Sequence, residues 1–251
     1  MSERLGDGVA FKAIDCLNGG IIEICEPSEK TLSDPDGVQT WPSFGFYEGA
    51  KCSTNANPSV IEETAAIALR KLERNFSYWV ERGLWTGAPA TAPIAANALA
   101  AQAVDDLGGP VGLITGFSRL VAALNAATGG NVGLIHGEQA LVPFLSWYNL
   151  ITRNGNILQV TGSDHIFVAG TGYTGTDPDG TAAAEGFSWL YATGAVKVVH
   201  SEIFIPTPAV DRSVNEIEVR AEAAAAAVFN PCAHIGIEVC LPDPGPDCGS
   251  A

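Results

Sequence analysis

The order of the predicted elements indicates an α+β fold. An irregular segment over residues 1–58 precedes one long amphipathic helix that begins at residue 59, and helices then mix with short strands up to about residue 193. From there on the pattern consists of strands. This order differs from the regular strand–helix alternation of a doubly wound sheet, and it is typical of α+β proteins.

The composition is that of a folded, acidic protein. The chain has 251 residues, of which 47% are hydrophobic and 16% charged, and the 28 acidic against 13 basic residues give a net charge of −15. Nucleic-acid recognition is therefore not expected, because the affinity for nucleic acid comes from Lys and Arg. A protein whose acidic surface encloses nucleic acid without binding it remains an alternative. No apolar run approaches the ~18 residues of a membrane span, and residues 1–12 lack the apolar core of a signal peptide. We expect a protein that is cytoplasmic when made and has no membrane partner.

Residues 1–58 predict an extended arm. Glycines and prolines interrupt its short apolar pieces, of which 21–25 (IIEIC) and 38–41 (VQTW) are expected to form the two strands of a long hairpin, with 34–37 (DPDG) near its tip. A segment with so little apolar content cannot form a compact core alone. We therefore expect it to reach out to another part or molecule.

The helix that follows has a clear start signal. Ser59 and Glu62 match a capping box directly after Pro58, in which each side chain satisfies an unpaired backbone donor. Apolar residues then recur at three- and four-residue spacing up to Val80. This periodicity predicts an amphipathic helix of about 24 residues, roughly 36 Å long, that ends at Gly83.

The middle of the chain mixes helices and strands. Two alanine-rich helices are predicted over 94–128, with a break at 108–110 (GGP). The other predicted elements are a strand over 131–136, a helix over 137–150 that Pro143 kinks or begins, a tight hairpin turn at 153–156, and strands over 157–160 and 165–170.

After a glycine-rich loop, strands are predicted over 187–193, 195–205 and 214–229. The last of them contains five consecutive alanines (223–227), which favour a helix by propensity. However, apolar and charged residues alternate before the alanines, and Pro231 would cut any helix to under three turns. We therefore predict a strand, with its alanines at a place where the long helix over 59–82 lies close to the sheet.

The sequence Gly170-Thr-Gly-Tyr-Thr-Gly175 matches the G-x-G-x-x-G pattern of dinucleotide-binding proteins. That pattern binds a pyrophosphate only where a helix opens on the loop, and here the turn-forming sequence TDPDGTAAAEG follows. We interpret the stretch as a flexible loop and expect no cofactor.

Catalytic residues are equally hard to assign. Asp164 with His165, and His200 with Ser201, raise the question of acid–base or nucleophilic chemistry, but no G-x-S-x-G elbow is present and the histidines are spread singly. An enzyme built on the glycine loop with Asp164 and His165 remains an alternative. The main expectation is a protein that is not an enzyme and has no catalytic residues.

The six cysteines fall into two groups, one near each end of the chain. None of them belongs to a C-x-x-C pair, and a zinc site that combines Cys232 with His234 is a minor alternative. Buried or idle thiols are the simplest interpretation. The other is that the cysteines cross-link subunits once a particle leaves the reducing cytoplasm; these candidates are Cys16, Cys25, Cys52, Cys232, Cys240 and Cys248.

Three stretches resemble major capsid proteins of tailed phages with the Hong Kong 97-like fold. The end of the chain, from AVKVVHSEIFI (195–205) to the unit Phe229-Asn-Pro-Cys-Ala233, is similar to the closing strands of that family. The middle of the chain resembles its axial domain, which related encapsulins share. The segment that begins at Ser59 is similar to its spine helix, including the Trp-Thr-Gly ending.

The resemblance implies an arrangement of the chain in four parts. These are an N-terminal arm and extended loop (1–58), the spine helix and the start of the peripheral domain (59–110), the axial domain (111–193), and the closing strands of the peripheral domain with a C-terminal tail (194–251).

The resemblance also implies a function and partners. It implies a structural protein of the virion that assembles with itself, as pentamers and hexamers, into an icosahedral shell around phage DNA. Scaffold, portal and decoration proteins would be further partners, and assembly would take place in the host cytoplasm. An encapsulin-type nanocompartment, or another virion part such as a tail or head–tail connector protein, is the alternative. Some relatives cross-link subunits through a lysine, but no pattern around Lys12, Lys30 or Lys51 assigns that role here.

Overall fold

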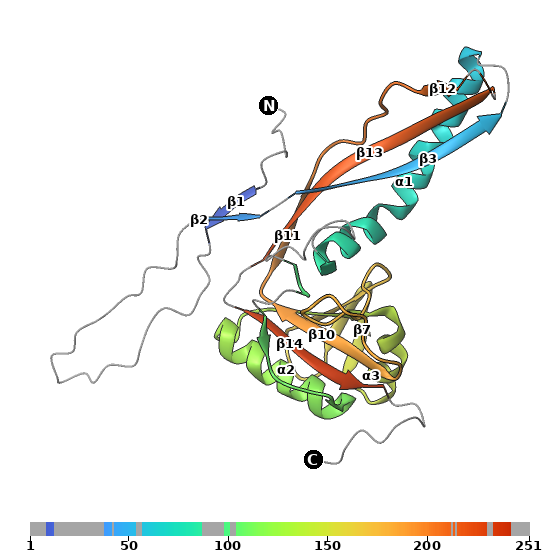
Figure 1. The fold of residues 1–251 in the computed structure, drawn as a ribbon. Helices are drawn as coiled ribbons and strands as arrows, with labels where there is room; N and C mark the ends of the chain where they lie inside the picture. Colours follow the sequence, from blue (N-terminus) through green and yellow to red (C-terminus); the bar gives the residue numbers. More distant parts are fainter. Residues whose placement is uncertain are drawn as a thin grey trace, which may run out of the picture.

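The computed structural model describes residues 9–12, 38–41, 43–53, 57–86, 98–100, 104–211, 213, 215–229 and 233–241. Two sheets organise them, a four-stranded one and an eight-stranded one. The smaller sheet and one long helix form an elongated arm, and the larger sheet with the shorter helices forms a compact body at its end (Figure 1). The α+β expectation is confirmed.

The smaller sheet is built around one long strand. β13 (Glu216–Phe229) pairs antiparallel with β3 (Phe44–Ser53) along most of its length. The opposite edge of β13 pairs with β11 (Val196–His200) at one end and with β12 (Ala209–Asp211) at the other. The strand predicted over 214–229 is thus confirmed. Only the first half of the strand predicted over 195–205 forms, as β11, and Phe204 makes a single bridge to Glu222.

Helix α1 (Pro58–Thr86) lies along this sheet. Its N-cap is Asn57, whose Oδ1 accepts a hydrogen bond from the backbone N–H of Val60 at 3.0 Å. Ser59 instead donates its hydroxyl to the same Asn57 oxygen, so the predicted capping box is wrong by two positions. Pro58 occupies the first turn, where its missing N–H costs nothing.

The helix also continues past Gly83, where the sequence predicted its end. A Cβ atom at this position would lie 2.2 Å from the ring of Phe44, so glycine lets β3 pack against the helix. A half-buried carboxylate fixes the same two elements, because Glu48 Oε1 accepts hydrogen bonds from Asn75 Nδ2 at 2.8 Å and Trp79 Nε1 at 3.0 Å.

The alanines of β13 lie under α1, as predicted. Ala221, Ala223 and Ala225 alternate toward the helix and pack against Ala68 and Leu72, which are fully buried. Such small side chains allow the helix and the sheet backbone to approach closely. The context of the sheet therefore overrides the helix propensity of the alanine run.

The larger sheet has the strand order β4-β14-β10-β6-β9-β8-β7, and β5 also pairs with β14. Its strands are β4 (Asp105–Asp106), β5 (Val111–Gly112), β6 (Leu134–Glu138), β7 (Ile151–Asn154), β8 (Ile157–Val160), β9 (Ile166–Gly170), β10 (Phe187–Thr193) and β14 (His234–Cys240). Parallel pairs (β6 with β9, β14 with β4 and β5) mix with antiparallel ones.

The core of the compact body lies between this sheet and helix α2 (Leu113–Thr128). Phe117, Leu120 and Leu124 on the helix pack against Ile135 and Ile237 on the sheet. Three short elements complete the body: a 3-10 helix (Gln139–Leu141), helix α3 (Val142–Trp147) with Pro143 in its first turn, and the β7–β8 hairpin closed by Gly155 and Asn156. The predicted hairpin and the strands over 157–160 and 187–193 are confirmed.

Some predicted elements differ from the structure or lie outside its described part. The helix predicted before the glycine pair does not continue into the described residues 98–100 and 104–107, which are bends and the two-residue strand β4. Helix 137–150 is shorter than expected, since 137–138 belong to β6. The predicted strand 21–25 and the turn 34–37 lie outside the described residues; the strand predicted over 38–41 forms, as β2 (Val38–Trp41), and pairs with β1 (Val9–Lys12).

After β13 the chain returns to the compact body, because β14 pairs with β10 over seven residues. The resemblance implied closing strands of the peripheral domain and a C-terminal tail over 194–251, whereas β14, within this range, belongs to the larger sheet. The β13-to-β14 connection therefore links the two sheets directly (Figure 1). None of the helices in the described part of the chain is long and apolar enough to span a membrane.

Candidate assembly surfaces

The open face of the smaller sheet, on the side away from α1, is charged. Along β13 the buried residues alternate with Glu216, Glu218, Arg220 and Glu222, which are exposed or half-buried. The alternation follows from the two-residue period of a strand, so residues 216–223 present an apolar face to α1 and a polar face to solvent, whereas residues 225–229 are buried throughout.

Ion pairs organise this face. Lys51 Nζ lies 2.9 Å from Glu216 Oε1 and 3.2 Å from Glu218 Oε2, and Arg220 Nη2 lies 2.6 Å from Glu218 Oε1. Hydrogen bonds with Glu216 and then Glu218 raise the pKa of Lys51, and those with Arg220 and then Lys51 lower the pKa of Glu218. Because all four side chains remain in contact with solvent, the network orients side chains across the strands more than it stabilises the fold.

Two aromatic side chains stand on the same open face. Tyr47 is directly opposite Glu222 on one edge, and Phe204 is opposite Glu222 on the other. Tyr47 is 59% exposed and Phe204 53% exposed, and the guanidinium carbon of Arg220 lies 5.3 Å from the Tyr47 ring centroid. Exposed aromatic and arginine side chains are enriched at surfaces that bind other proteins.

The compact body has a second exposed apolar area. Trp147, at the end of α3, is 83% exposed, and the next residue, Tyr148, is 40% exposed. Val132 and Ile157 on the same body are half exposed. Tryptophan is among the residues that contribute most to protein–protein binding.

The arm and the compact body meet at an aromatic cluster that the sequence did not predict. Trp85, near the end of α1, is fully buried, and its Nε1 donates a hydrogen bond to Thr176 Oγ1 at 2.8 Å. Its ring centroid lies 4.8 Å from that of Tyr173 and 5.0 Å from that of Tyr191, whose hydroxyl donates to the Thr176 carbonyl. The sequence predicted that the helix ends at Gly83, which would place Trp85 in a loop. The role of Trp85 in this cluster was therefore not predicted.

A buried histidine borders the same cluster. The ring nitrogens of His136 lie 3.1 Å from the Tyr173 hydroxyl and 2.9 Å from Thr193 Oγ1. Burial, and secondarily the charge of His234, lowers the pKa of His136 to about 3. Burial also raises the pKa of the Tyr173 and Tyr191 hydroxyls. All three side chains are therefore neutral structural groups at neutral pH.

The glycine-rich stretch after β9 is a loop, as predicted, and no helix follows it. Its glycines have a packing role. A Cβ atom at Gly172 would lie 2.2 Å from the carbonyl oxygen of Tyr78, and the Gly172 N–H donates to Glu81 Oε2 at 2.9 Å. The loop is thus held against α1 by close backbone contact, which the pattern G-x-G-x-x-G alone did not indicate.

The candidate catalytic residues have structural partners. His165 Nδ1 accepts a hydrogen bond from the Gly133 N–H, which leaves Nε2 as the donor to Asn125 Oδ1 at 3.1 Å. His200 Nδ1 lies 2.9 Å from the carbonyl oxygen of Ser201, and the Ser201 hydroxyl donates to the Glu202 carbonyl at 2.9 Å. The pairs named from the sequence therefore lack the nucleophile–base hydrogen bond of a triad within the described part of the chain.

The cysteines are only partly described. Cys52 is half-buried and free, and Cys240 is disulfide-bonded. Cys16, Cys25, Cys232 and Cys248 lie outside the described residues. His234 Nε2 donates to the Leu99 carbonyl at 2.8 Å, so this nitrogen is occupied, and the described residues hold no group of three or more side chains that could bind a metal.

Comparisons with known proteins place the fold. No family model and no curated protein matches the chain. The solved structure named Gordonia phage Cozz matches with a TM-score of 0.53 at 14% identity and covers 95% of this chain and 82% of that chain. The capsid of Ralstonia phage GP4 matches with a TM-score of 0.53 at 12% identity, covering 96% and 86%. An encapsulin complex from Synechococcus elongatus matches with a TM-score of 0.51 at 9% identity, covering 94% and 85%.

The chain therefore has the Hong Kong 97-like fold, as the sequence resemblance indicated. The match extends over nearly the whole chain and includes both the arm and the compact body.

Proposed function

We propose that this chain is a major capsid protein that assembles with itself into an icosahedral shell enclosing phage DNA. The observation that supports this most directly is the similarity to the capsid of Ralstonia phage GP4 over 96% of the chain. Under this proposal the protein is a structural component of the virion and not an enzyme. It assembles in the host cytoplasm as pentamers and hexamers.

The surfaces of the molecule support the proposal. A closed shell requires one surface patch of each subunit to meet a different patch of its neighbour. The chain offers separate patches of this kind on the arm, at Tyr47 and Phe204, and on the compact body, at Trp147. Its net charge of −15 also suits a wall that encloses DNA without binding it non-specifically.

The proposed division of the chain follows from the same function. Residues 1–58 act as the N-terminal arm and extended loop, a different part from the elongated arm of sheet and helix described above. Residues 59–110 act as the spine helix and the start of the peripheral domain, and 111–193 as the axial domain. Residues 194–251 act as the closing part, of which β13 lies in the smaller sheet and β14 in the larger one. Scaffold, portal and decoration proteins are the partners that a shell of this type would need.

Electron microscopy of the purified chain, expressed alone and with a candidate scaffold, tests the proposal. We expect closed particles of uniform diameter. A chain that stays monomeric at high concentration in both preparations would contradict the proposal, and rings or tubes would indicate a connector or tail protein instead.

A second candidate function is that of an encapsulin-type compartment, which the similarity to the Synechococcus elongatus complex favours. The contents of native particles distinguish the two. Nuclease-protected DNA supports the capsid, whereas an enclosed protein cargo without DNA supports the compartment.

The proposed cysteine cross-links need a separate test. The inter-subunit candidates are Cys16, Cys25, Cys52, Cys232, Cys240 and Cys248, of which Cys52 is free and Cys240 is already disulfide-bonded. Non-reducing gels of mature particles should show species above 26.0 kDa that disappear on reduction. Only monomer under oxidising conditions would exclude them.

A further inference from the structure

Strand β3 forms one edge of the smaller sheet. All ten of its residues face β13 on one side, and no strand in the described part of the chain pairs with it on the other. Figure 1 shows the two strands running side by side. An edge strand presents a row of backbone N–H and C=O groups that can pair with another chain. β3 is a long template of this kind, since the mean strand has about 5–6 residues.

The hydrogen bonds of β13 show which backbone groups of β3 point outward. The N–H and the C=O of Glu222 both bond to Phe204, at the opposite edge of β13, with distances of 2.9 and 3.0 Å. They are therefore not available to Tyr47, the residue of β3 that faces Glu222. In an antiparallel pair, a residue without such bonds turns its own N–H and C=O away from the partner strand. Tyr47 thus directs both groups to the outer edge.

The alternation of a strand extends this result along β3. Residues two positions apart have the same orientation, so the outward set is Gly45, Tyr47, Gly49, Lys51 and Ser53. Ala224, which faces Gly45, agrees with this assignment, because its carbonyl and its N–H both bond to Ser201. Among the described residues, the outward backbone groups have one partner, Lys71, whose Nζ donates to the Gly49 carbonyl at 3.0 Å.

The outer edge is accessible. Gly45 is exposed and Gly49 is half-buried, and for a glycine this exposure is that of the backbone itself. Proteins often block such an edge with a proline or with a lysine that projects from it. Residues 44–53 contain no proline, and Lys51 turns across β13 to pair with two glutamates. The edge is therefore open to a further strand.

The length of β3 selects the strand that can pair with it. A partner that uses all five outward residues must itself be an edge strand of about nine residues. The other edge strands in the described part of the chain have two to five residues. β3 of a second copy is the described strand that matches this length.

One antiparallel register uses every outward residue of both copies. It is centred on Gly49 and pairs Gly45 with Ser53, Tyr47 with Lys51, and Gly49 with itself. No like charges face each other in this register. The ammonium group of Lys51 instead faces the ring of Tyr47 of the second copy, and a cation beside an aromatic ring is favourable.

The helices are compatible with this pairing. Because α1 packs against both β3 and β13, it lies under the two strands and not beyond the edge. With strands about 4.8 Å apart, two helices that are each centred under their own strand pair would lie roughly 10 Å apart, the ordinary distance between packed helices. Lys71 is exposed, so its ammonium group can turn to solvent when an N–H of the second copy takes its place.

We propose that β3 pairs antiparallel with β3 of a second copy, about a two-fold axis at Gly49. The pairing joins two four-stranded sheets into one of eight strands. This inference rests on the proposed shell function and names one contact within it. An icosahedral shell contains two-fold axes, and at such an axis the same surface of two subunits meets itself.

Disulfide trapping tests the axis. Gly49→Cys places two thiols opposite each other, on residues whose Cα atoms would be about 5.5 Å apart, within the range of a disulfide. Gly45→Cys is the matched control, because it lies on the same face of β3 but roughly 27 Å from its own copy. After treatment with oxidised glutathione, non-reducing gels should show more disulfide-linked dimer than wild type for Gly49→Cys, and the wild-type amount for Gly45→Cys.

A proline variant tests the backbone pairing. Gly49→Pro removes an N–H that points outward and takes no part in pairing with β13. We expect the protein concentration at which particles sediment to rise by roughly tenfold, because each contact loses two central hydrogen bonds. The matched control, Gly49→Ala, keeps the N–H, and its Cβ atom would lie 3.7 Å from the Val219 carbonyl oxygen, an ordinary contact. It should assemble at the wild-type concentration, and circular dichroism checks that both variants are folded.

Three results would overturn the contact. They are the wild-type amount of dimer in Gly49→Cys, cross-linking of both cysteine variants, and unchanged assembly of a folded Gly49→Pro. Impaired assembly of Gly49→Pro without cross-linking of Gly49→Cys would mean that the edge pairs with a different segment. If Gly49→Pro does not fold, the two cysteine variants still decide.

The failure of this inference is separable from failure of the proposed function. Wild-type particles without the Gly49→Cys cross-link would keep the shell and exclude the β3 contact. A cross-linked Gly49→Cys dimer from a chain that never forms particles would exclude the shell and keep the contact.

Discussion

The arm and the compact body of this molecule are stabilised in different ways. The body buries large side chains such as Phe117, Leu120 and Ile135 between one helix and an eight-stranded sheet. The arm places one helix on one layer of sheet, and much of the contact is made by alanines, among them Ala68 and Ala223. One helix on one sheet layer buries less apolar area per residue than a larger core does, so we expect core substitutions to cost less stability in the arm than in the body.

The largest expected effect tests the core of the body. Phe117→Ala removes a ring that is 2% exposed, and we expect it to lower the free energy of unfolding by about 3–5 kcal/mol in urea denaturation. Phe46→Ala in the arm, where the ring is 6% exposed, is the comparison, and we expect a smaller loss. Equal losses would contradict the difference between the two parts.

The next effect concerns pH, and it arises where the body meets the arm. Burial holds the folded-state pKa of His136 at about 3, below its ordinary value of 6.5, so the unfolded state binds more protons between these values. The free energy of unfolding should therefore decrease as the pH falls from about 6.5 toward 3, with a contribution from His136 of up to about 1.4 kcal/mol per pH unit.

Thermal unfolding of His136→Gln across this range checks the assignment. The slope should become shallower by the contribution of one histidine. An unchanged slope in His136→Gln would assign the acid sensitivity to other groups.

A third prediction tests the close contact in the arm. Ala223→Leu places a larger side chain between β13 and α1 and should destabilise the protein by about 1–3 kcal/mol through overpacking. Ala224→Leu, one residue further and on the open face, is the matched control and should cost little. Hydrogen exchange can locate the loss, which should appear in α1 and β3 and spare α2.

The smallest expected effect concerns the start of α1. Asn57→Ala removes the acceptor for the Val60 N–H and should cost about 0.5–2 kcal/mol, measured by thermal unfolding. Ser59→Ala should cost less, because the Ser59 hydroxyl only donates to Asn57. A larger loss of stability in Ser59→Ala than in Asn57→Ala would instead support Ser59 as the N-cap, as the sequence predicted.

The sequence predicted those features that depend on local periodicity. The strand character of 214–229 followed from alternation before the alanines, and the hairpin around Gly155 followed from an Asn-Gly pair. The end of α1 could not be predicted, because glycine commonly ends a helix. Gly83 instead lies inside α1, where its lack of a side chain leaves space for the Phe44 ring of β3. Local signals do not report which residue from elsewhere fills the space beside a glycine.

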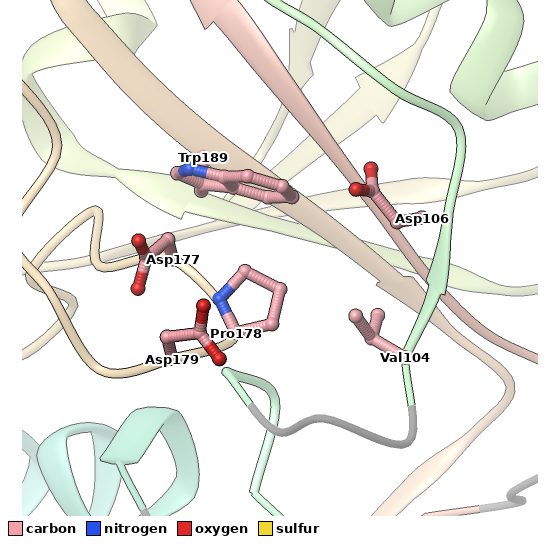
Figure 2. A pocket seen from close by; sticks show the side chains of 6 residues that line it. All are labelled: Val104, Asp106, Asp177, Pro178, Asp179 and Trp189. Atoms are coloured by element: carbon pink, nitrogen blue, oxygen red, sulfur yellow. The ribbon is translucent and has the colours of Figure 1, made fainter.

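The candidate surfaces were less predictable for the same reason. The charged face of β13 could be read from the alternation, but its ion-pair partner Lys51 comes from β3, 165 positions before Glu216. The pocket that Asp106, Asp177 and Trp189 line (Figure 2) joins a two-residue strand, a loop and a central strand of the larger sheet. Such sites exist only after the chain has brought distant segments together.

The contact at Gly172 has a consequence for how this sequence can evolve. Any side chain there would enter the backbone of α1 at Tyr78, and the Gly172 N–H is also held by Glu81. Among natural relatives with the same helix-to-loop contact, we expect position 172 to remain glycine even where the rest of the loop changes in length and composition. Lineages that lost this glycine would have had to move the helix as well, so the two segments are expected to diverge together.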